Sequence, residues 1–144
     1  MIQKAAKKDG GAIAALALQL WPDNTLAEFT EEFSSLVSEP EVAVFLAFDG
    51  ETPIGCAQCQ LRHDYVEGTD SSPVGYREGI FVTEKYRRMG YAKLLLVACE
   101  VWAKKMGYRE FASDCELTNE ESLRFHLNAG FQEANRIICF TKQL

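Results

Sequence analysis

The order of three elements between Gly79 and Met106 constrains this chain more than any other feature. Residues 79–82 are a short apolar run with the character of a buried strand. A polar turn with the pattern Arg-x-x-Gly-x-Ala follows, and residues 93–106 then contain no Gly or Pro and predict a helix. The first amides of a helix have no partners inside it, and its dipole is positive at that end. A strand, a tight turn and such a helix together predict an anion-binding site.

The turn itself carries the side chains that an anion site needs. Gly90 lets the backbone approach a ligand closely, Ala92 keeps the next helical turn narrow, and Arg87 and Arg88 add positive charge. The turn is not a Walker loop, because no Gly-Lys-Ser/Thr ends it, and it lacks the three glycines of a dinucleotide-binding fingerprint. On these residues alone, a plain strand-to-helix connection with two solvated arginines fits equally well.

Two motifs in the same order resemble those of the GNAT acyltransferase superfamily. The strand followed by Arg-x-x-Gly-x-Ala is similar to its acetyl-CoA pyrophosphate loop, and Asn119-x-x-Ser122-x-x-x-His126-x-x-x-Gly130-Phe131 is similar to its second motif. The resemblance implies acetyl-CoA as cosubstrate and no metal. It implies that a split strand pairs with pantetheine through its backbone, as an added strand would. The implied acetyl-CoA residues are Ile80, Phe81 and Val82 for pantetheine, Arg87, Arg88, Gly90, Tyr91 and Ala92 for pyrophosphate, and Asn119 for a further hydrogen bond.

The pattern along the chain predicts one α/β (α+β) domain over residues 1–144. The expected order, β-α-α-β-β-β-α-β-α-β, is that of the GNAT fold, a mixed and mostly antiparallel sheet with helices on both faces. Capping patterns at Asp9, Thr25-x-x-Glu28 and Thr118-x-x-Glu121 mark three helix starts. The expected strands lie at 1–6, 41–48, 53–62, 75–83, 109–115 and 137–140, and the expected helices at 9–20, 25–38, 88–106 and 118–129.

Composition and charge narrow the function classes. The chain is 47% hydrophobic and 25% charged, as in an ordinary soluble protein, and no stretch has the eighteen apolar residues of a membrane span. Five cysteines and no convincing signal-peptide cleavage site predict reduced thiols in the cytoplasm. Cys56 and Cys59 should point to opposite faces of a strand, which favours two buried thiols over a metal site.

The net charge of −6 is unevenly distributed. From residue 9 to residue 61 there are nine acidic residues and no Lys or Arg. Such a chain repels phosphate backbones, so we expect no nucleic-acid partner, and it attracts polycations. A solvated acidic surface that keeps the protein soluble explains most of these carboxylates equally well.

A longer string strongly resembles the aminoglycoside 6'-N-acetyltransferases within that superfamily. Residues 65–76, with the sequence YVEGTDSSPVGY, carry it, together with the segments 20–22 and 78–80. The resemblance implies acetyl transfer to the 6'-amine of a cationic antibiotic, and a homodimer with residues 137–140 as a contact or core strand. Those enzymes have an acidic residue where this chain has Asn135, so a neutral hydrogen bond there should narrow the substrate range. The implied substrate-binding residues are Trp21, Tyr65, Glu78, Asp114 and Asn135.

The chemistry predicted from these residues is direct attack of the amine on the thioester, because no Cys is paired with an activating base. Glu78 is the first choice to receive the amine's proton and Asp114 the second; each could also be a surface carboxylate at a strand end. His126 stands where the superfamily often has a Tyr that protonates the leaving thiolate, or is a partly exposed helix histidine. Trp21 also fits a helix-end core position.

The competing functions are a GNAT enzyme for another polyamine or a peptide amine, and a non-catalytic CoA-binding sensor.

Overall fold

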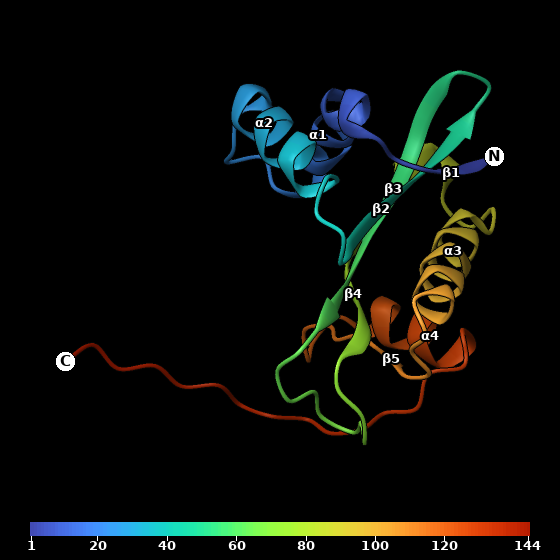
Figure 1. The fold of residues 1–144 in the computed structure, drawn as a ribbon. Helices are drawn as coiled ribbons and strands as arrows, with labels where there is room; N and C mark the ends of the chain where they lie inside the picture. Colours follow the sequence, from blue (N-terminus) through green and yellow to red (C-terminus); the bar gives the residue numbers. More distant parts are fainter.

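A five-stranded sheet forms the centre of the computed structural model, which describes all 144 residues. The strands lie in the order β1-β2-β3-β4-β5; every neighbouring pair is antiparallel except β4 and β5, which are parallel. Helices α1 and α2 cover one face of the sheet and α3 covers the other, with α4 below α3 (Figure 1). The elements are β1 (Ile2–Lys4), α1 (Gly10–Leu20), α2 (Leu26–Leu36), β2 (Val42–Asp49), β3 (Thr52–Arg62), β4 (Val74–Val82), α3 (Tyr91–Lys105), β5 (Phe111–Ala112) and α4 (Glu120–Asn128), with short 3₁₀ turns at Lys7–Asp9 and Glu84–Tyr86.

Two of the three predicted cap residues lie at helix starts, and one of them makes the capping hydrogen bond. Thr25 caps α2, because its hydroxyl accepts a hydrogen bond from the amide of Glu28. Asp9 occupies the N-cap position of α1 as predicted, but its carboxylate makes no capping hydrogen bond: it accepts from the amide of Ala6 and holds the 3₁₀ turn before the helix. At α4 the predicted cap is one residue early, since Asn119 and not Thr118 caps the helix.

Alternation along the central strands builds two apolar layers. Val44 and Leu46 on β2 pack with α1 and α2, whereas Ala43 and Ala47 pack with α3. The same alternation separates the two cysteines of β3 as predicted: Cys59 is buried in the α3 layer and Cys56 contacts the α1–α2 layer. The described side chains include no group of three metal-ligating residues, and no helix is long and apolar enough to cross a membrane.

Strand β4 contains a bulge at Glu78. Opposite it on β3, Gln58 pairs with Gly79 while the next residue, Cys59, pairs with Arg77, so Glu78 has no partner. The extra residue reverses which face the following side chains take. Tyr76 lies among loop residues on the α1–α2 side of the sheet, whereas Ile80, also an even position, lies on the α3 side.

Strands β4 and β5 part soon after they meet. Their pairing is limited to Gly75 with Phe111 and Tyr76 with Ala112, and from Arg77 onward β4 has a ladder partner only on β3. The predicted strand over 109–115 is therefore much shorter in the structure. Its early end leaves one edge of β4 open just before the predicted phosphate turn.

The predicted last strand is wrong. Residues 132–144 form no helix or strand and run away from the body of the protein (Figure 1). Ile137, Ile138 and Phe140 are 69%, 78% and 87% exposed. An apolar run of this kind gains nothing from forming a strand unless it has a sheet to pack on, and within one chain this tail reaches none.

Candidate functional site

The phosphate turn has the geometry expected of an anion site. Gly90 caps α3 in the left-handed conformation, with φ of 88°, and a β-carbon added there would touch no other atom. Arg88 also has a positive φ, of 63°, which is uncommon for a residue with a side chain. Arg87 and Arg88 are exposed, and Arg87 Nε donates to the carbonyl of Val82 at 2.8 Å. The turn therefore presents free helix amides and two guanidinium groups at one place.

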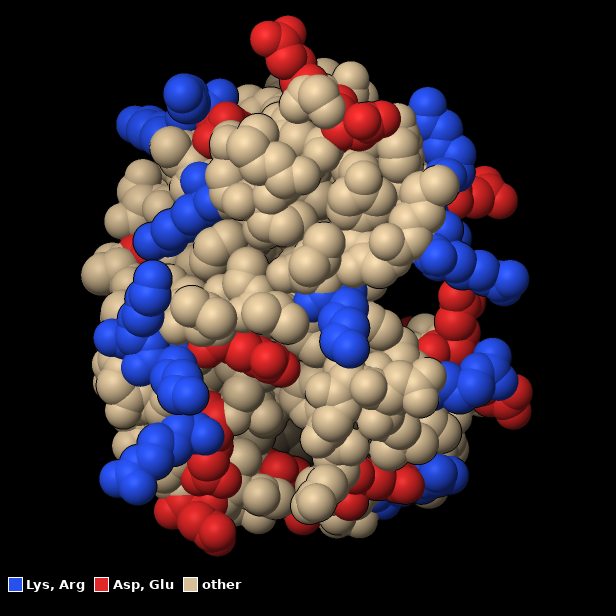
Figure 2. Space-filling view, turned by 90° about the vertical axis from the view of Figure 1, so that its right-hand side faces the viewer, with Lys and Arg blue, Asp and Glu red and all other residues tan.

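The open edge of β4 leads directly to that turn. Ile80, Phe81 and Val82 pair with β3 on one side only, and α3 begins nine residues after Val82, at Tyr91. An extended thioester arm fits this edge because it can hydrogen-bond like an added strand, and its anionic end then reaches the helix start. The face of the molecule that carries α3 has Lys and Arg along both edges, and hollows interrupt it (Figure 2). These residues fit acetyl-CoA.

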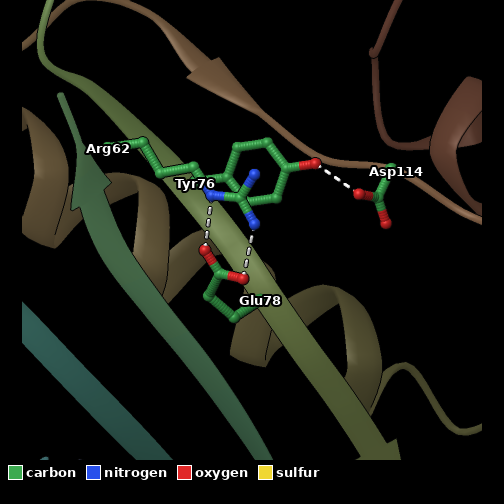
Figure 3. Close-up of polar contacts among 4 residues, drawn as sticks. All are labelled: Arg62, Tyr76, Glu78 and Asp114. Carbon is green, nitrogen blue, oxygen red and sulfur yellow. Dashed lines mark hydrogen bonds and ion pairs between the residues drawn. The ribbon is translucent and has the colours of Figure 1, made fainter. Parts of the chain in front are cut away.

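Four side chains form one polar network on the α1–α2 side of β4. Both oxygens of Glu78 accept from Arg62, at 2.7 Å from Nε and 2.8 Å from the terminal nitrogen (Figure 3). The same guanidinium lies flat over Tyr76, 3.5 Å from the ring centroid. The Tyr76 hydroxyl donates to Asp114 at 2.5 Å. The network thus joins the two carboxylates that the sequence nominated, through two residues that it did not.

The charges within this network support one another. The hydrogen bond from Arg62 to Glu78 raises the pKa of the guanidinium, and the negative charges of Glu78 and Asp114 act in the same direction. Burial raises the pKa of Tyr76, and its hydrogen bond to Asp114 adds to this. Tyr76 is therefore a hydrogen-bond donor at neutral pH and not a base. The network, which we call the acceptor-side network, holds two carboxylates and one cation.

A second network lies on the opposite side of β4, next to α4. Arg77 is buried and donates to the hydroxyl of Ser113 at 2.8 Å and to the backbone carbonyl of Asp114 at 3.1 Å. Its terminal nitrogen lies 3.2 Å from Nε2 of His126. Arg77 therefore bridges the point at which β4 and β5 separate. Burial lowers the pKa of this guanidinium, since it has no carboxylate in contact.

His126 belongs to this second network, on the far side of the sheet from Glu78. It is 8% exposed, and its Nδ1 lies 2.6 Å from the carbonyl of Ser122, to which it must donate. Its Nε2 lies 2.8 Å from the Ser113 hydroxyl. Burial lowers its pKa, and the charge of Arg77 lowers it further. The geometry therefore supplies a neutral histidine whose one proton is already donated, which argues against the acid role.

The remaining nominated residues are not gathered into the acceptor-side network. Tyr65 is 79% exposed on the loop after β3. Asn135 lies on the tail, where its amide donates to Glu67 at 3.2 Å. Asn119 uses its side-chain oxygen to cap α4, and only its NH₂ group is free for a ligand. Trp21 ends α1, is 47% exposed, and lies against Gly79, where an added β-carbon would come within 3.7 Å of its ring.

A small apolar pocket connects Trp21 to the open strand. It lies between α1, α2 and the sheet on the acceptor side of β4. The partly exposed ring of Trp21 and the bare backbone of Gly79 give it a flat wall of the type that sugar rings pack against. The pocket is lined by Ile13, Ala17, Leu20, Trp21, Phe33, Val44, Cys56, Gln58, Gly79, Ile80 and Phe81.

Sequence reasoning missed Arg62, Tyr76, Arg77 and Ser113. One signal for Arg62 was present: it is the first basic residue after the acidic stretch 9–61, and it ends a strand. A cation that follows so many acidic residues can pair with any of several carboxylates, so the sequence does not identify its partner. Tyr76 and Arg77 follow plain alternation, but the faces of the residues after Glu78 could not be assigned, because a bulge leaves no mark in the hydrophobic pattern when the residues at it are Glu and Gly.

Comparison with known proteins agrees with this geometry. Residues 8–131 match the model of the Acetyltransferase (GNAT) family. The chain is 41% identical, over 99% of its length and 93% of the relative's, to the aminoglycoside N(6')-acetyltransferase type 1 of Stenotrophomonas maltophilia. It is 37% identical, over 90% of both chains, to the protein of the same name from Serratia marcescens.

Two solved structures agree along the whole chain. AAC(6')-Iy in complex with the bisubstrate analogue CoA-S-monomethyl-acetylneamine has a TM-score of 0.94 and 35% identity, over 100% of this chain and 98% of that one. The apo form of AAC(6')-IG from Acinetobacter haemolyticus has a TM-score of 0.90, also at 35% identity, over 100% and 99%. The split strand, the glycine-capped helix and these matches lead to one conclusion: the chain belongs to the acetyltransferase (GNAT) family.

Proposed function

We infer that this protein transfers the acetyl group of acetyl-CoA to the 6'-amine of aminoglycosides. The observation that carries this inference is the pair of carboxylates, Glu78 and Asp114, beside the open edge of β4 where a thioester would lie. Aminoglycosides carry several ammonium groups, so their site needs fixed negative charges. The relatives named above are aminoglycoside N(6')-acetyltransferases, and one is bound to an analogue that joins CoA to an acetylated neamine.

The cosubstrate is held by the phosphate turn and the open strand. Arg87, Arg88 and the first amides of α3, at Gly90, Tyr91 and Ala92, bind the pyrophosphate, and the backbone of residues 80–82 binds pantetheine. The free amide group of Asn119 adds a donor from α4. The strand amides near Ile80 also polarise the thioester carbonyl and stabilise negative charge as it develops on the oxygen.

The acceptor is held on the other side of β4. Trp21 offers a ring face to a sugar, Tyr65 a second one from the loop, and Glu78 and Asp114 bind ammonium groups. The amine arrives mostly protonated and must lose a proton before it attacks the thioester directly. Glu78, directly or through a water, is the first choice as acceptor of this proton. Asp114 is the second, because Tyr76 engages only one of its oxygens.

Thiol release with a panel of amines tests this function. We expect free CoA to appear with kanamycin-type aminoglycosides, and no release above background with spermine or with a lysine peptide. Release with spermine or the peptide alone would favour another amine-acetylating GNAT enzyme. Tight acetyl-CoA binding without release for any amine would favour a sensor.

The assembly proposed for this enzyme is a homodimer in the cytoplasm. The tail exposes Ile137, Ile138 and Phe140, and β5 is an edge strand with an unpaired outer side. A second copy whose tail lies along that edge covers both features at once. Five free cysteines suit a reducing compartment, in which acetyl-CoA is also present.

Sedimentation velocity tests the assembly. We expect a dimer at micromolar concentration, and a monomer for the double variant Ile138→Asp/Phe140→Asp, which places charge on the proposed contact. The exposed double variant Leu117→Asp/Leu127→Asp, which changes the same number of apolar residues elsewhere, should remain dimeric. A wild-type monomer would contradict the proposal.

A further inference from the structure

The acceptor-side network already contains a cation in the place that the substrate's ammonium needs. Arg62 lies between the carboxylate of Glu78 and the ring of Tyr76, and the charge of Asp114 also acts on it (Figure 3). Its fork occupies both oxygens of Glu78. An ammonium that is to contact Glu78 in the same plane must first take those hydrogen bonds from the guanidinium.

Arg62 is held by its ion pair with Glu78 and by the ring of Tyr76. Its hydrogen bonds all go to Glu78, and its side chain is 36% exposed, so its way out to solvent is open. No Lys or Arg occurs between residues 9 and 61, so Arg62 is the first cation after a long acidic stretch of the sequence. It lies at the end of β3, where a long side chain can swing without moving the strand.

We propose that Arg62 is a tethered stand-in for the substrate cation, and that acceptor binding is an exchange in which an ammonium replaces the guanidinium on Glu78. This inference rests on the proposed function. Arg62 then determines affinity for the acceptor: it keeps Glu78 aligned in the free enzyme, and every acceptor must break the pair to bind. Its departure also frees Glu78 to take the amine's proton.

The alternative is that Arg62 stays in place and only positions Glu78. The two roles have opposite consequences when the guanidinium is removed. Under exchange, the acceptor binds more tightly because a competitor is gone. Under positioning, it binds more weakly, because Glu78 loses the group that aligns it.

Arg62→Met tests the inference, since methionine has an unbranched stem of similar length but no guanidinium and no charge. We expect calorimetry to show about three- to fivefold tighter binding of kanamycin, the scale of one partly exposed ion pair. The KM for acetyl-CoA should stay unchanged. Arg62→Lys, which keeps the charge but loses the fork, should lie between wild type and Arg62→Met. The control Arg124→Met removes an exposed charge on α4 and should leave kanamycin affinity within experimental error.

A small cation gives a second and independent readout. Methylguanidinium should compete with kanamycin in Arg62→Met, because it refills the place that the side chain left. The wild type, whose own guanidinium is already there, should be far less sensitive at the same concentration. A folded Arg62→Met protein that binds kanamycin equally or more weakly, with no competition by methylguanidinium, would overturn the exchange. Wild-type enzyme that releases no CoA with any aminoglycoside would instead overturn the proposed function.

Discussion

One arginine network lies on each side of the sheet at β4, formed by Arg62 at the end of β3 and by Arg77 within β4, and the two arginines are held in opposite ways. Arg62 is partly exposed and makes its hydrogen bonds to one carboxylate, which raises its pKa. Arg77 is buried, bonds only to neutral oxygen and nitrogen atoms, and has its pKa lowered by burial. Asp114 takes part in both networks, with its carboxylate on one side and its carbonyl on the other.

This difference separates an exchangeable contact from a permanent one. A guanidinium on a solvent-facing carboxylate can be replaced by another cation at small cost. Arg77 cannot be replaced in this way, because breaking its contacts with its three partners would leave buried polar groups without hydrogen bonds. The acceptor side of the strand is therefore built to change partners, and the α4 side to hold β5 and α4 in place where the strands separate.

The largest expected effect is on the acceptor side, with Glu78→Gln. If Glu78 receives the amine's proton, turnover at saturating aminoglycoside should fall about 10²-fold or more, the usual scale of general base catalysis. The control Glu51→Gln, at the exposed hairpin turn, should leave turnover unchanged. Near-normal turnover with a raised KM would make Glu78 an anchor for the ammonium and move the base assignment to Asp114.

The matching change on the α4 side should act on stability instead. Arg77→Met removes three hydrogen bonds at the strand split, and we expect the free energy of unfolding to fall by about 2–3 kcal/mol, as for buried charge-assisted bonds. Urea titration measures this. Arg62→Met should cost less than about 1 kcal/mol. Equal losses for the two variants would break the distinction between exchangeable and permanent contacts.

Tyr76→Phe should have a smaller effect on both quantities. It removes the hydrogen bond to Asp114 but keeps the ring under Arg62, so unfolding should become easier by about 1 kcal/mol. The freed Asp114 carboxylate should also shift the KM for the aminoglycoside more than the KM for acetyl-CoA. A change confined to acetyl-CoA would place Tyr76 on the cofactor side.

The smallest expected effect is the contribution of His126 to the pH dependence of stability. Its folded-state pKa is lowered, against about 6.5 in the unfolded chain. Its contribution is therefore complete above about pH 6.5 and is lost as the pH falls from there through the folded-state pKa, because the unfolded chain binds the proton first. His126→Gln should make unfolding free energy less pH-dependent in that window, with His63→Gln, at the other histidine, as matched control. An unchanged slope would mean that His126 binds its proton equally in the folded and unfolded chains, which would contradict the lowered pKa.

Sequence reasoning reached the fold because local patterns determine most of it. The helices, the hairpin from β2 to β3 and the glycine-capped start of α3 follow from periodicity, turn residues and caps. Residues 137–140 read as a strand for the same reason, but a strand also needs a neighbour, and none exists within one chain. The acceptor carboxylates were found through a resemblance, whereas their connection through Arg62 depends on which face each side chain takes, which the hydrophobic pattern does not encode.

Because of the bulge at Glu78, the faces that the side chains of β4 take depend on the number of residues in the strand as well as on their types. The residues beyond the bulge face the sides that their partners on β3 face, so deleting Glu78 would restore regular alternation without turning them over. A register slip that pairs Glu78 with Gln58 would instead turn Gly79 through Val82 over together, so Phe81 would leave the α1–α2 layer and Ile80 the α3 layer. Because Glu78 is left out of the ladder, the acceptor carboxylate and the core residues beyond it can each face the correct side of the sheet.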